Sequence, residues 1–219
     1  MSRFRQIALG ILLVFILLIL LAGSIGCYLA FYDHGINYDF DPQKVAASET
    51  RMWKFYYTGQ GEDLGWEMVS IMREQMGVSF LTAAAVVEPM ARGTMIFARA
   101  EGNYETTVLP KLEEAYANLA KACNTNWDAR ELAKAELDWW EARRSPDTYD
   151  PAIVGAKIAH LYALLYGQTN PQIERAGLLR AQAAALRDEG GPNADWPAIE
   201  QMLVESYTTL RDGIQSGRS

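Results

Sequence analysis

The sequence predicts an all-α protein, in which a single N-terminal transmembrane helix precedes one soluble domain of about eight helices. Three observations support this prediction. A charge-free apolar run covers residues 7–32, helix start and stop signals recur along the rest of the chain, and no segment alternates apolar and polar residues between two turn signals. At 219 residues, one span followed by one domain is the natural division of the chain.

The apolar run is expected to anchor the chain in a membrane. A cleaved signal peptide has an apolar core of about 7–15 residues and then a polar region, whereas here apolar residues continue to Tyr32. The stretch SIGC, residues 24–27, resembles a lipidation signal loosely, but Ser24 stands where leucine is usual. An uncleaved span over residues 7–32 is therefore the preferred interpretation, and lipidation of Cys27 stays open.

Residues at the two ends of the run predict its orientation and its contacts. Arg3 and Arg5 precede it, whereas acidic residues follow it, so the positive-inside rule places residues 1–6 in the cytoplasm and the domain outside. Aromatic residues are expected to form a belt at the outer interface, and small residues to let a neighbouring span approach closely. The belt residues are Tyr28, Phe31 and Tyr32, and the small residues are Gly10, Ala22, Gly26 and Ala30.

After an acidic linker at 33–41, every segment of the domain, residues 42–213, is predicted to be helical or a turn. Helices are expected at 42–57, 61–76, 79–100, 106–124 and 128–144, and from Pro151, Pro171 and Asp195 onward. Asp or Asn directly before Pro marks several starts. Gly167, Gly190 and Gly213 mark ends, which leaves 214–219 as a free tail. Pro89 is expected to kink or divide its helix.

The helix-turn-helix pairing in this domain is also that of tetratricopeptide-like solenoids. The 34-residue signature of those repeats is absent from the chain. A single domain is therefore favoured over an open array of repeats.

Charge and motif content exclude several function classes. Arg3 and Arg5 are two of the 20 basic residues, so 18 remain in the soluble part against 27 acidic ones, and such a domain repels nucleic acid. His34 and His160 are the only histidines, and His160 has no carboxylate three or four residues before it, so it is expected to be a core residue. No nucleophile, phosphate-loop or haem-attachment motif is present. The sequence therefore predicts no cofactor, no metal and no enzymatic activity.

The segment DWWEARR, residues 138–144, is the densest functional candidate. On a helix, Trp139 stands one turn before Arg143 and Trp140 one turn before Arg144, a spacing that allows each guanidinium to stack on an indole. Because Trp and Arg often dominate interfaces, these four residues are the predicted partner-binding patch, with Glu136 bracing an arginine. The competing interpretation is a packed core edge with one buried tryptophan.

Four segments within residues 128–212 form a recognisable series, namely AELDWWEARR, HLYALLYG, GLLRAQAAALRDEGG and ADWPAIEQMLVESYTTL. This series resembles a pattern found in an uncharacterised family of bacterial single-span membrane proteins with a helical periplasmic domain. The resemblance implies a bacterial origin, so the membrane is expected to be the inner membrane and the outside to be the periplasm. With the orientation that the positive-inside rule predicts, the N-terminus then lies in the cytoplasm and the domain in the periplasm. It implies no activity and no functional residue.

Two functions are compatible with these observations. The first is a non-enzymatic accessory or scaffolding subunit of a larger bacterial membrane complex, of the respiratory or photosynthetic kind. Its anchor would pack on other integral membrane subunits and its domain would cap their periplasmic face. The alternative is a free-standing, membrane-anchored periplasmic adaptor that binds a peptide, glycan or protein in an aromatic-lined groove. The candidate groove residues are Trp53, Phe55, Tyr56, Tyr57 and Trp66.

Overall fold

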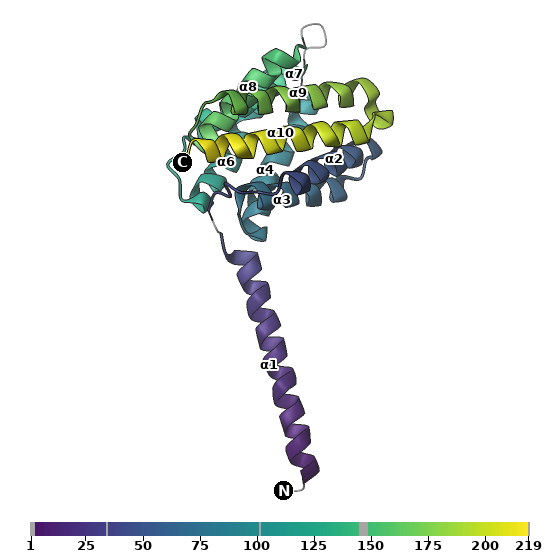
Figure 1. The fold of residues 1–219 in the computed structure, drawn as a ribbon, viewed down its shortest axis with the longest axis vertical. Coiled ribbons are helices and arrows are strands. Elements are labelled where there is room, and N and C mark those ends of the chain that lie inside the picture. Colours follow the sequence, from purple (N-terminus) through teal and green to yellow (C-terminus); the bar gives the residue numbers. More distant parts are fainter. Residues whose placement is uncertain (1–2, 34, 101, 145–148, 219) are drawn as a thin grey trace.

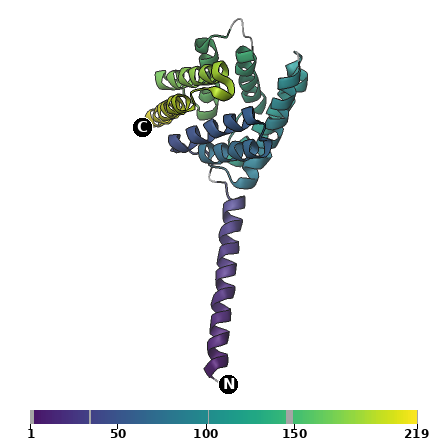
Figure 2. The same ribbon diagram turned by 90° about the vertical axis from the view of Figure 1, so that its right-hand side faces the viewer.

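The computed structural model describes residues 3–33, 35–100, 102–144 and 149–218, and it describes only the backbone of residues 3–11, 29 and 30. Within these ranges the chain forms ten α-helices and one short 3-10 helix, with no strand. This confirms the predicted all-α class. One long helix, α1 (Arg3–Phe31), stands apart from a bundle formed by all the others (Figures 1 and 2).

The bundle contains eight long helices and the one-turn helix α5 among the described residues. Most boundaries agree with the prediction to within a residue or two, because side chains of Asp41, Asp150, Asn170 and Asp195 cap the first turns as expected. The elements are α2 (Pro42–Thr58), α3 (Gly61–Met76), α4 (Phe80–Arg99), α5 (Tyr104–Thr107), α6 (Leu109–Cys123), α7 (Ala129–Arg144), α8 (Pro151–Tyr166), α9 (Pro171–Gly190), η1 (Gly191–Asn193) and α10 (Trp196–Ser216).

The eight long helices form a closed ring. Each packs on the next one along the chain, from α2 through α3, α4, α6, α7, α8 and α9 to α10, and α10 returns to pack on α2. An open solenoid would leave its first and last helices apart. The ring therefore agrees with a single domain, and it brings the two ends of the domain into contact.

Helices α8 and α9 cross at a contact between two glycines. A Cβ atom on Gly155 would lie 2.6 Å from the Cα atom of Leu178, and a Cβ on Gly177 would collide with the backbone oxygen of Gly155. The missing side chains let the two backbones touch. Eight of the sixteen residues of α8 are buried, whereas Ile153 at its start is 52% exposed.

The C-terminal segment corrects the prediction of a helix end at Gly213 followed by a free tail. Helix α10 continues to Ser216, and the side chain of Ile214 is fully buried. Gln215 Nε2 donates a hydrogen bond to Asp39 Oδ1 at 2.8 Å. Gly213 packs against α9, where an added Cβ would lie 3.0 Å from the Cβ of Gln172. Glycine at this position serves close packing, and it does not end the helix.

The segment predicted to be an acidic linker, 33–41, lies against the domain. The Asp33 carboxylate accepts hydrogen bonds from the backbone N–H of Ser79 at 2.7 Å and from Thr82 Oγ1 at 3.0 Å, at the start of α4. Asn37 Nδ2 donates to the backbone oxygen of Glu74 at 2.7 Å, and Phe40 is fully buried. These hydrogen bonds hold the C-terminal end of α1 against the domain. His34 lies outside the described residues.

Helix α4 is continuous, so Pro89 does not divide it. Judged by length and composition alone, α4 is the one helix among those described that is long and apolar enough to cross a membrane, while Leu12–Tyr28 and Pro151–Tyr166 are shorter apolar helices. Helix α4 nevertheless packs on α3 and α6 within the ring and carries an Arg92–Glu88 ion pair. The single N-terminal span therefore stays a prediction.

Two glycine substitutions are expected to change stability in opposite directions. Gly177→Ala should lower the free energy of unfolding by about 2–3 kcal/mol, because the new methyl group forces α8 and α9 apart. Gly65→Ala on α3 meets open space and should raise it by about 1 kcal/mol, since alanine favours helix more than glycine does. Urea unfolding of the full-length protein in detergent, followed by circular dichroism, measures both. Stabilisation by both substitutions would disprove the close crossing.

Candidate functional site

A buried ion pair lies where the first and last helices of the ring meet. Glu49 on α2 is 4% exposed, and its Oε1 accepts hydrogen bonds from Arg180 Nε and Nη2 on α9, at 3.2 and 3.0 Å. Its Oε2 accepts a hydrogen bond from the hydroxyl of Tyr207 on α10. One carboxylate therefore joins α2, α9 and α10.

Both members of this pair are held in their charged forms. Burial opposes charge on Glu49, but the attraction of Arg180 and the hydrogen bond from Tyr207 outweigh it, so the pKa of Glu49 lies below its ordinary value. Burial also opposes charge on Arg180, yet the Glu49 carboxylate raises the pKa of Arg180 well above its ordinary value. The pair is ionised at neutral pH.

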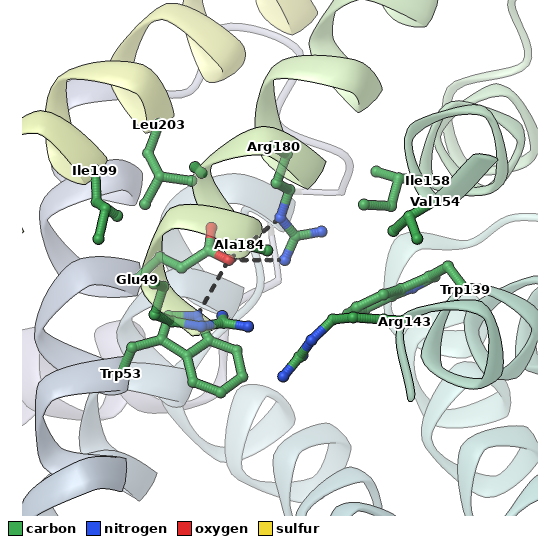
Figure 3. A pocket seen from close by; sticks show the side chains of 12 residues that line it. Glu49, Trp53, Trp139, Arg143, Val154, Ile158, Arg180, Ala184, Ile199 and Leu203 are labelled. Carbon is green, nitrogen blue, oxygen red and sulfur yellow. Dashed lines mark hydrogen bonds and ion pairs between the residues drawn. The ribbon is translucent and has the colours of Figure 1, made fainter. Parts of the chain in front are cut away.

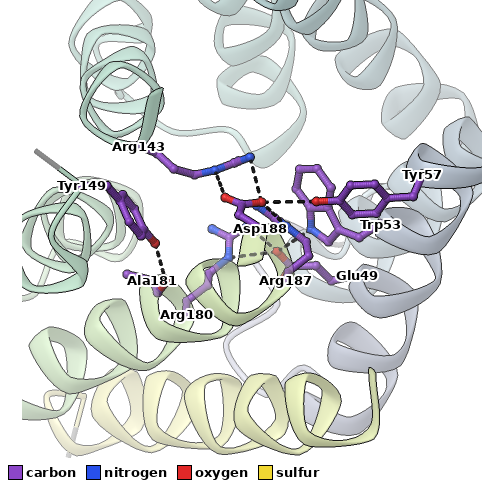
Figure 4. A network of polar contacts seen from close by, with 9 residues as sticks. All are labelled: Glu49, Trp53, Tyr57, Arg143, Tyr149, Arg180, Ala181, Arg187 and Asp188. Carbon is purple, nitrogen blue, oxygen red and sulfur yellow. Dashed lines mark hydrogen bonds and ion pairs between the residues drawn. The ribbon is translucent and has the colours of Figure 1, made fainter. Parts of the chain in front are cut away.

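A second carboxylate, Asp188 on α9, is shared by two arginines (Figure 4). Arg143 Nε on α7 donates to Asp188 Oδ2 at 2.9 Å, and Arg187 Nε donates to Oδ1 at 2.9 Å. The guanidinium of Arg187 lies 3.6 Å from the ring centroid of Trp53. Arg187 itself is only 3% exposed. Burial is the main effect that lowers the pKa of Arg187, and repulsion from Arg143 is the second.

A cavity of about 20 Å³ lies between these groups (Figure 3). This volume is about that needed for one water molecule or an ion of similar size. The polar residues that line it are Glu49, Trp53, Trp139, Arg143, Arg180 and Arg187, and apolar side chains of α8, α9 and α10 complete the wall. Trp139 Nε1 is buried and has no hydrogen-bond partner among the described residues. We call this cavity and its polar lining the arginine cavity.

The predicted patch on α7 divides between two sides of the helix. Trp139 and Arg143 line the arginine cavity. Trp140 and Arg144 instead face α4 and α5, where the guanidinium of Arg144 lies 4.8 Å from the ring centroid of Phe97. The structure does not gather the four residues into one exposed face, because Trp139 is only 8% exposed and the other three are half-buried. This geometry is closer to the packed core edge that was the competing interpretation.

The side-chain pairing expected within α7 is wrong in detail. Arg143 lies over Trp53 and not over Trp139, whose ring is covered by Arg180 at 5.6 Å from the centroid. Glu136, expected to brace an arginine, accepts hydrogen bonds at 2.8 Å from Trp140 Nε1 and from the hydroxyl of Tyr116. The neighbouring helices of the ring offer these side chains partners that spacing along one helix does not reveal.

The predicted membrane residues lie on or beside α1. Tyr28, Phe31 and Tyr32 are 50%, 68% and 52% exposed, and the rings of Tyr28 and Tyr32 stack with centroids 4.8 Å apart. Ala22 and Gly26 lie on exposed helix, whereas Gly10 and Ala30 fall where only the backbone is described.

His160 corrects the prediction of a core histidine, because it is exposed on the outer side of α8. Within the described residues, no group of three or more His, Cys, Asp or Glu side chains is arranged to hold a metal ion. Cys123 is buried, and burial raises the pKa of its thiol to about 11, which makes it unreactive at neutral pH.

The aromatic residues proposed for a groove do not share one surface. Trp53, Tyr56 and Tyr57 form a continuous series of ring contacts that ends at Trp196. Trp66 lies elsewhere, stacked on Phe80 of α4 with ring centroids 5.6 Å apart. Only Trp53 of the five reaches the arginine cavity.

Sequence reasoning missed most of the charged residues that line the arginine cavity and the two residues, Asp188 and Tyr207, that bind them. Glu49, Arg180, Arg187, Asp188 and Tyr207 were not singled out. A signal was present, since Arg180 interrupts the apolar stretch GLLRAQAAAL and Glu49 follows VAAS. A lone charge on an otherwise apolar helix face is seldom buried unless it is paired.

Removal of the Glu49 side chain is expected to destabilise the domain strongly. Glu49→Ala should cost about 3–5 kcal/mol, because it leaves the Arg180 charge without a partner. The matched control is Glu205→Ala, which breaks an ion pair with Arg175 whose side chains are 52% and 62% exposed and should cost less than about 1 kcal/mol. Equal losses in urea unfolding would show that the Glu49 pair is no stronger than a surface pair.

The Glu49 carboxylate is also expected to make the stability of the fold decrease at acid pH. The folded state lowers the pKa of Glu49, so the ionised carboxylate contributes to the free energy of unfolding. This contribution is fully present above the unfolded-state pKa of about 4.3, and it is lost as the pH falls through the lower folded-state pKa. Glu49→Gln, which cannot ionise, should flatten this acid dependence. The melting temperature measured between neutral pH and pH 3 tests this, and an unchanged slope would contradict it.

The chain has no recognised relative among the proteins and structures compared with it. Searches against protein-family models, curated proteins and solved structures found no match. The resemblance to the bacterial single-span family therefore stays an expectation.

Proposed function

We propose that this chain is a non-enzymatic accessory or scaffolding subunit of a larger bacterial membrane complex. In this proposal α1 is a single span of the inner membrane, its N-terminus lies in the cytoplasm, and the helical ring covers the periplasmic face of partner subunits. The exposure of α1 is the observation that carries the proposal.

The described side chains of α1 form an apolar surface that the rest of the chain leaves open. Every residue from Leu12 to Leu21 is a large hydrophobic residue at least 44% exposed. Apolar surface of this extent marks a site that another molecule or a membrane covers. A helix satisfies its own backbone hydrogen bonds, which is the condition for crossing a lipid bilayer. Among the described helices, α1 contacts the ring chiefly at α4, and this contact is small compared with those between the ring helices.

The hydrogen bonds of residues 33–41 support a domain held at the membrane surface. Asp33 follows the end of α1 at Phe31 by two residues and binds the start of α4 directly. A long flexible tether would let the domain reach distant ligands, whereas this attachment keeps it beside the span. Such placement suits a subunit that caps neighbouring spans.

The buried acidic groups suit a structural role better than a catalytic one. The Glu49 carboxylate accepts hydrogen bonds from Arg180 and Tyr207, and the Glu136 carboxylate accepts them from Tyr116 and Trp140. General acid–base catalysis requires a carboxyl group within reach of a substrate. These two are engaged by neighbouring helices, which favours the non-enzymatic assignment.

Gentle detergent extraction from native membranes, followed by native electrophoresis, tests the proposal. We expect the 24.5 kDa chain to remain with membranes and to migrate within a large assembly of fixed composition. Gly26→Leu should weaken that association, because it fills a small position through which a second span could approach. The neighbouring Ile25→Leu is the matched control and should leave the assembly intact.

A chain that migrates alone or as a small homo-oligomer would refute the subunit proposal. The adaptor alternative would then be the better description of the protein. Recovery of the full-length chain from the soluble fraction would refute the anchor itself, and both proposals would fail.

A further inference from the structure

The start of α4 and the neighbouring side of α3 carry an exposed apolar patch. The indole of Trp66 on α3 stacks on the ring of Phe80 on α4, with centroids 5.6 Å apart. Trp66 is 53% exposed, and Leu81, the residue after Phe80, is 45% exposed. We call Trp66, Phe80 and Leu81 the α3–α4 patch. The described part of the chain leaves much of this patch open to its surroundings.

Hydrogen bonds hold this patch close to the C-terminal end of α1. The residues that flank it on α4, Ser79 and Thr82, both bind the carboxylate of Asp33, at 2.7 and 3.0 Å. Asp33 follows Phe31, the last residue of α1, by two positions, and two residues of extended chain span at most about 7 Å. Figure 1 shows α3 and α4 on the side of the ring that faces α1. An α1 that ends at a membrane surface therefore places the patch at that surface.

An exposed arginine and an open cleft lie beside the patch. Arg73 stands about two helical turns after Trp66, so the two residues share one side of α3. Arg73 is exposed, and its guanidinium makes no hydrogen bond or ion pair with another described residue. The cleft is lined by Ser70 and Arg73 of α3 and by Gly35 and Asn37, which follow α1. Its volume of about 680 Å³ is within the range of pockets that hold small organic groups.

We propose that the α3–α4 patch lies on the surface of the lipid bilayer, with Trp66 and Leu81 at headgroup depth and the Arg73 guanidinium on a lipid phosphate. Tryptophan is enriched at membrane interfaces because its ring is amphipathic, and a guanidinium binds phosphate through two parallel N–H groups. Beyond α1 the chain carries 18 of its 20 basic residues and all 27 acidic ones. It would be repelled by an anionic surface, so the lipid is zwitterionic. This inference rests on the proposed span.

The contact with lipid gives the ring a defined orientation. A single helix leaves the domain above it free to tilt, whereas a second attachment beside the end of α1 fixes the tilt. Helices α8 and α9 lie farther from α1 than α3 does (Figure 1). They would stay clear of the bilayer and remain available to partner subunits.

Quenching of tryptophan fluorescence tests the contact in the full-length protein, reconstituted into phosphatidylcholine vesicles. The quencher is phosphatidylcholine with a nitroxide near the headgroup end of an acyl chain. Trp66→Phe should remove most of the quenched emission, because Trp66 is the tryptophan that the proposal places in the interface. Trp196→Phe is the matched control. Trp196 packs on Tyr57 and Lys54 of α2, and its loss should leave the quenched emission unchanged.

A second variant tests the phosphate contact without altering the patch. Arg73→Gln keeps Trp66 in place but removes the charge, so the ring should lift and the quenching of Trp66 should decrease. Arg175→Gln changes an exposed arginine on α9 and should leave the quenching as it is. All four substitutions fall outside the buried core, and circular dichroism confirms that the variants fold.

Flotation of the vesicles on a density gradient separates failure of this inference from failure of the anchor. A protein that floats with the vesicles, but whose quenching is unaffected by Trp66→Phe or by Arg73→Gln, would overturn the lipid contact and leave the anchor intact. The α3–α4 patch would then be a surface for a partner protein. A protein that does not float would refute the span and this inference together.

Discussion

The contact of Glu49 with Arg180 and Tyr207 is the interaction on which the closed ring depends. Its members lie 131 and 158 residues apart in sequence, and they join the first helix of the domain to the last two. Most other helix contacts in the ring connect neighbours along the chain. Loss of one partner from a buried ion pair costs more than the intact pair contributes, because the remaining charge stays buried. The pair therefore favours closure over alternative arrangements of the same helices.

The aromatic residues around this contact extend its influence across the ring. Trp53 on α2 lies beneath the guanidinium of Arg187, while Trp139 on α7 lies beneath that of Arg180. Stacking of a guanidinium on an indole is worth more when the charge is partly removed from water. The arginines of α9 thus connect opposite sides of the ring through charge and ring contacts together.

The attachment of α1 to the ring follows a different physical principle. Asp33 places a carboxylate at the start of α4, where free backbone N–H groups and the helix dipole favour negative charge. The interaction is local to one helix end, yet it orients α1 relative to the whole ring (Figure 1). A short polar segment can in this way hold an apolar helix at a defined place beside a helical ring.

Sequence patterns located nearly every helix because helix ends depend on nearby residues. Asp41, Asp150 and Asn170 bind N–H groups only two or three residues away, so the signal lies within a few positions of the structure it produces. The same patterns failed at Gly213, where a contact with α9 and not the local backbone explains the glycine. The patterns also failed to predict that His160 is exposed, because the neighbouring helices determine which side of α8 faces outward.

The primary sequence was therefore sufficient for the helical class, for the approximate helix limits and for the apolar character of α1. Ring closure, the partners of Glu49 and the arginine cavity became visible only in three dimensions. Capping and helix periodicity act over three or four residues, whereas the partner of a buried charge is set by which helices meet. Trp139 and Arg143 illustrate the difference, because their spacing suggested that they stack on each other, and packing instead gave each a partner from another helix.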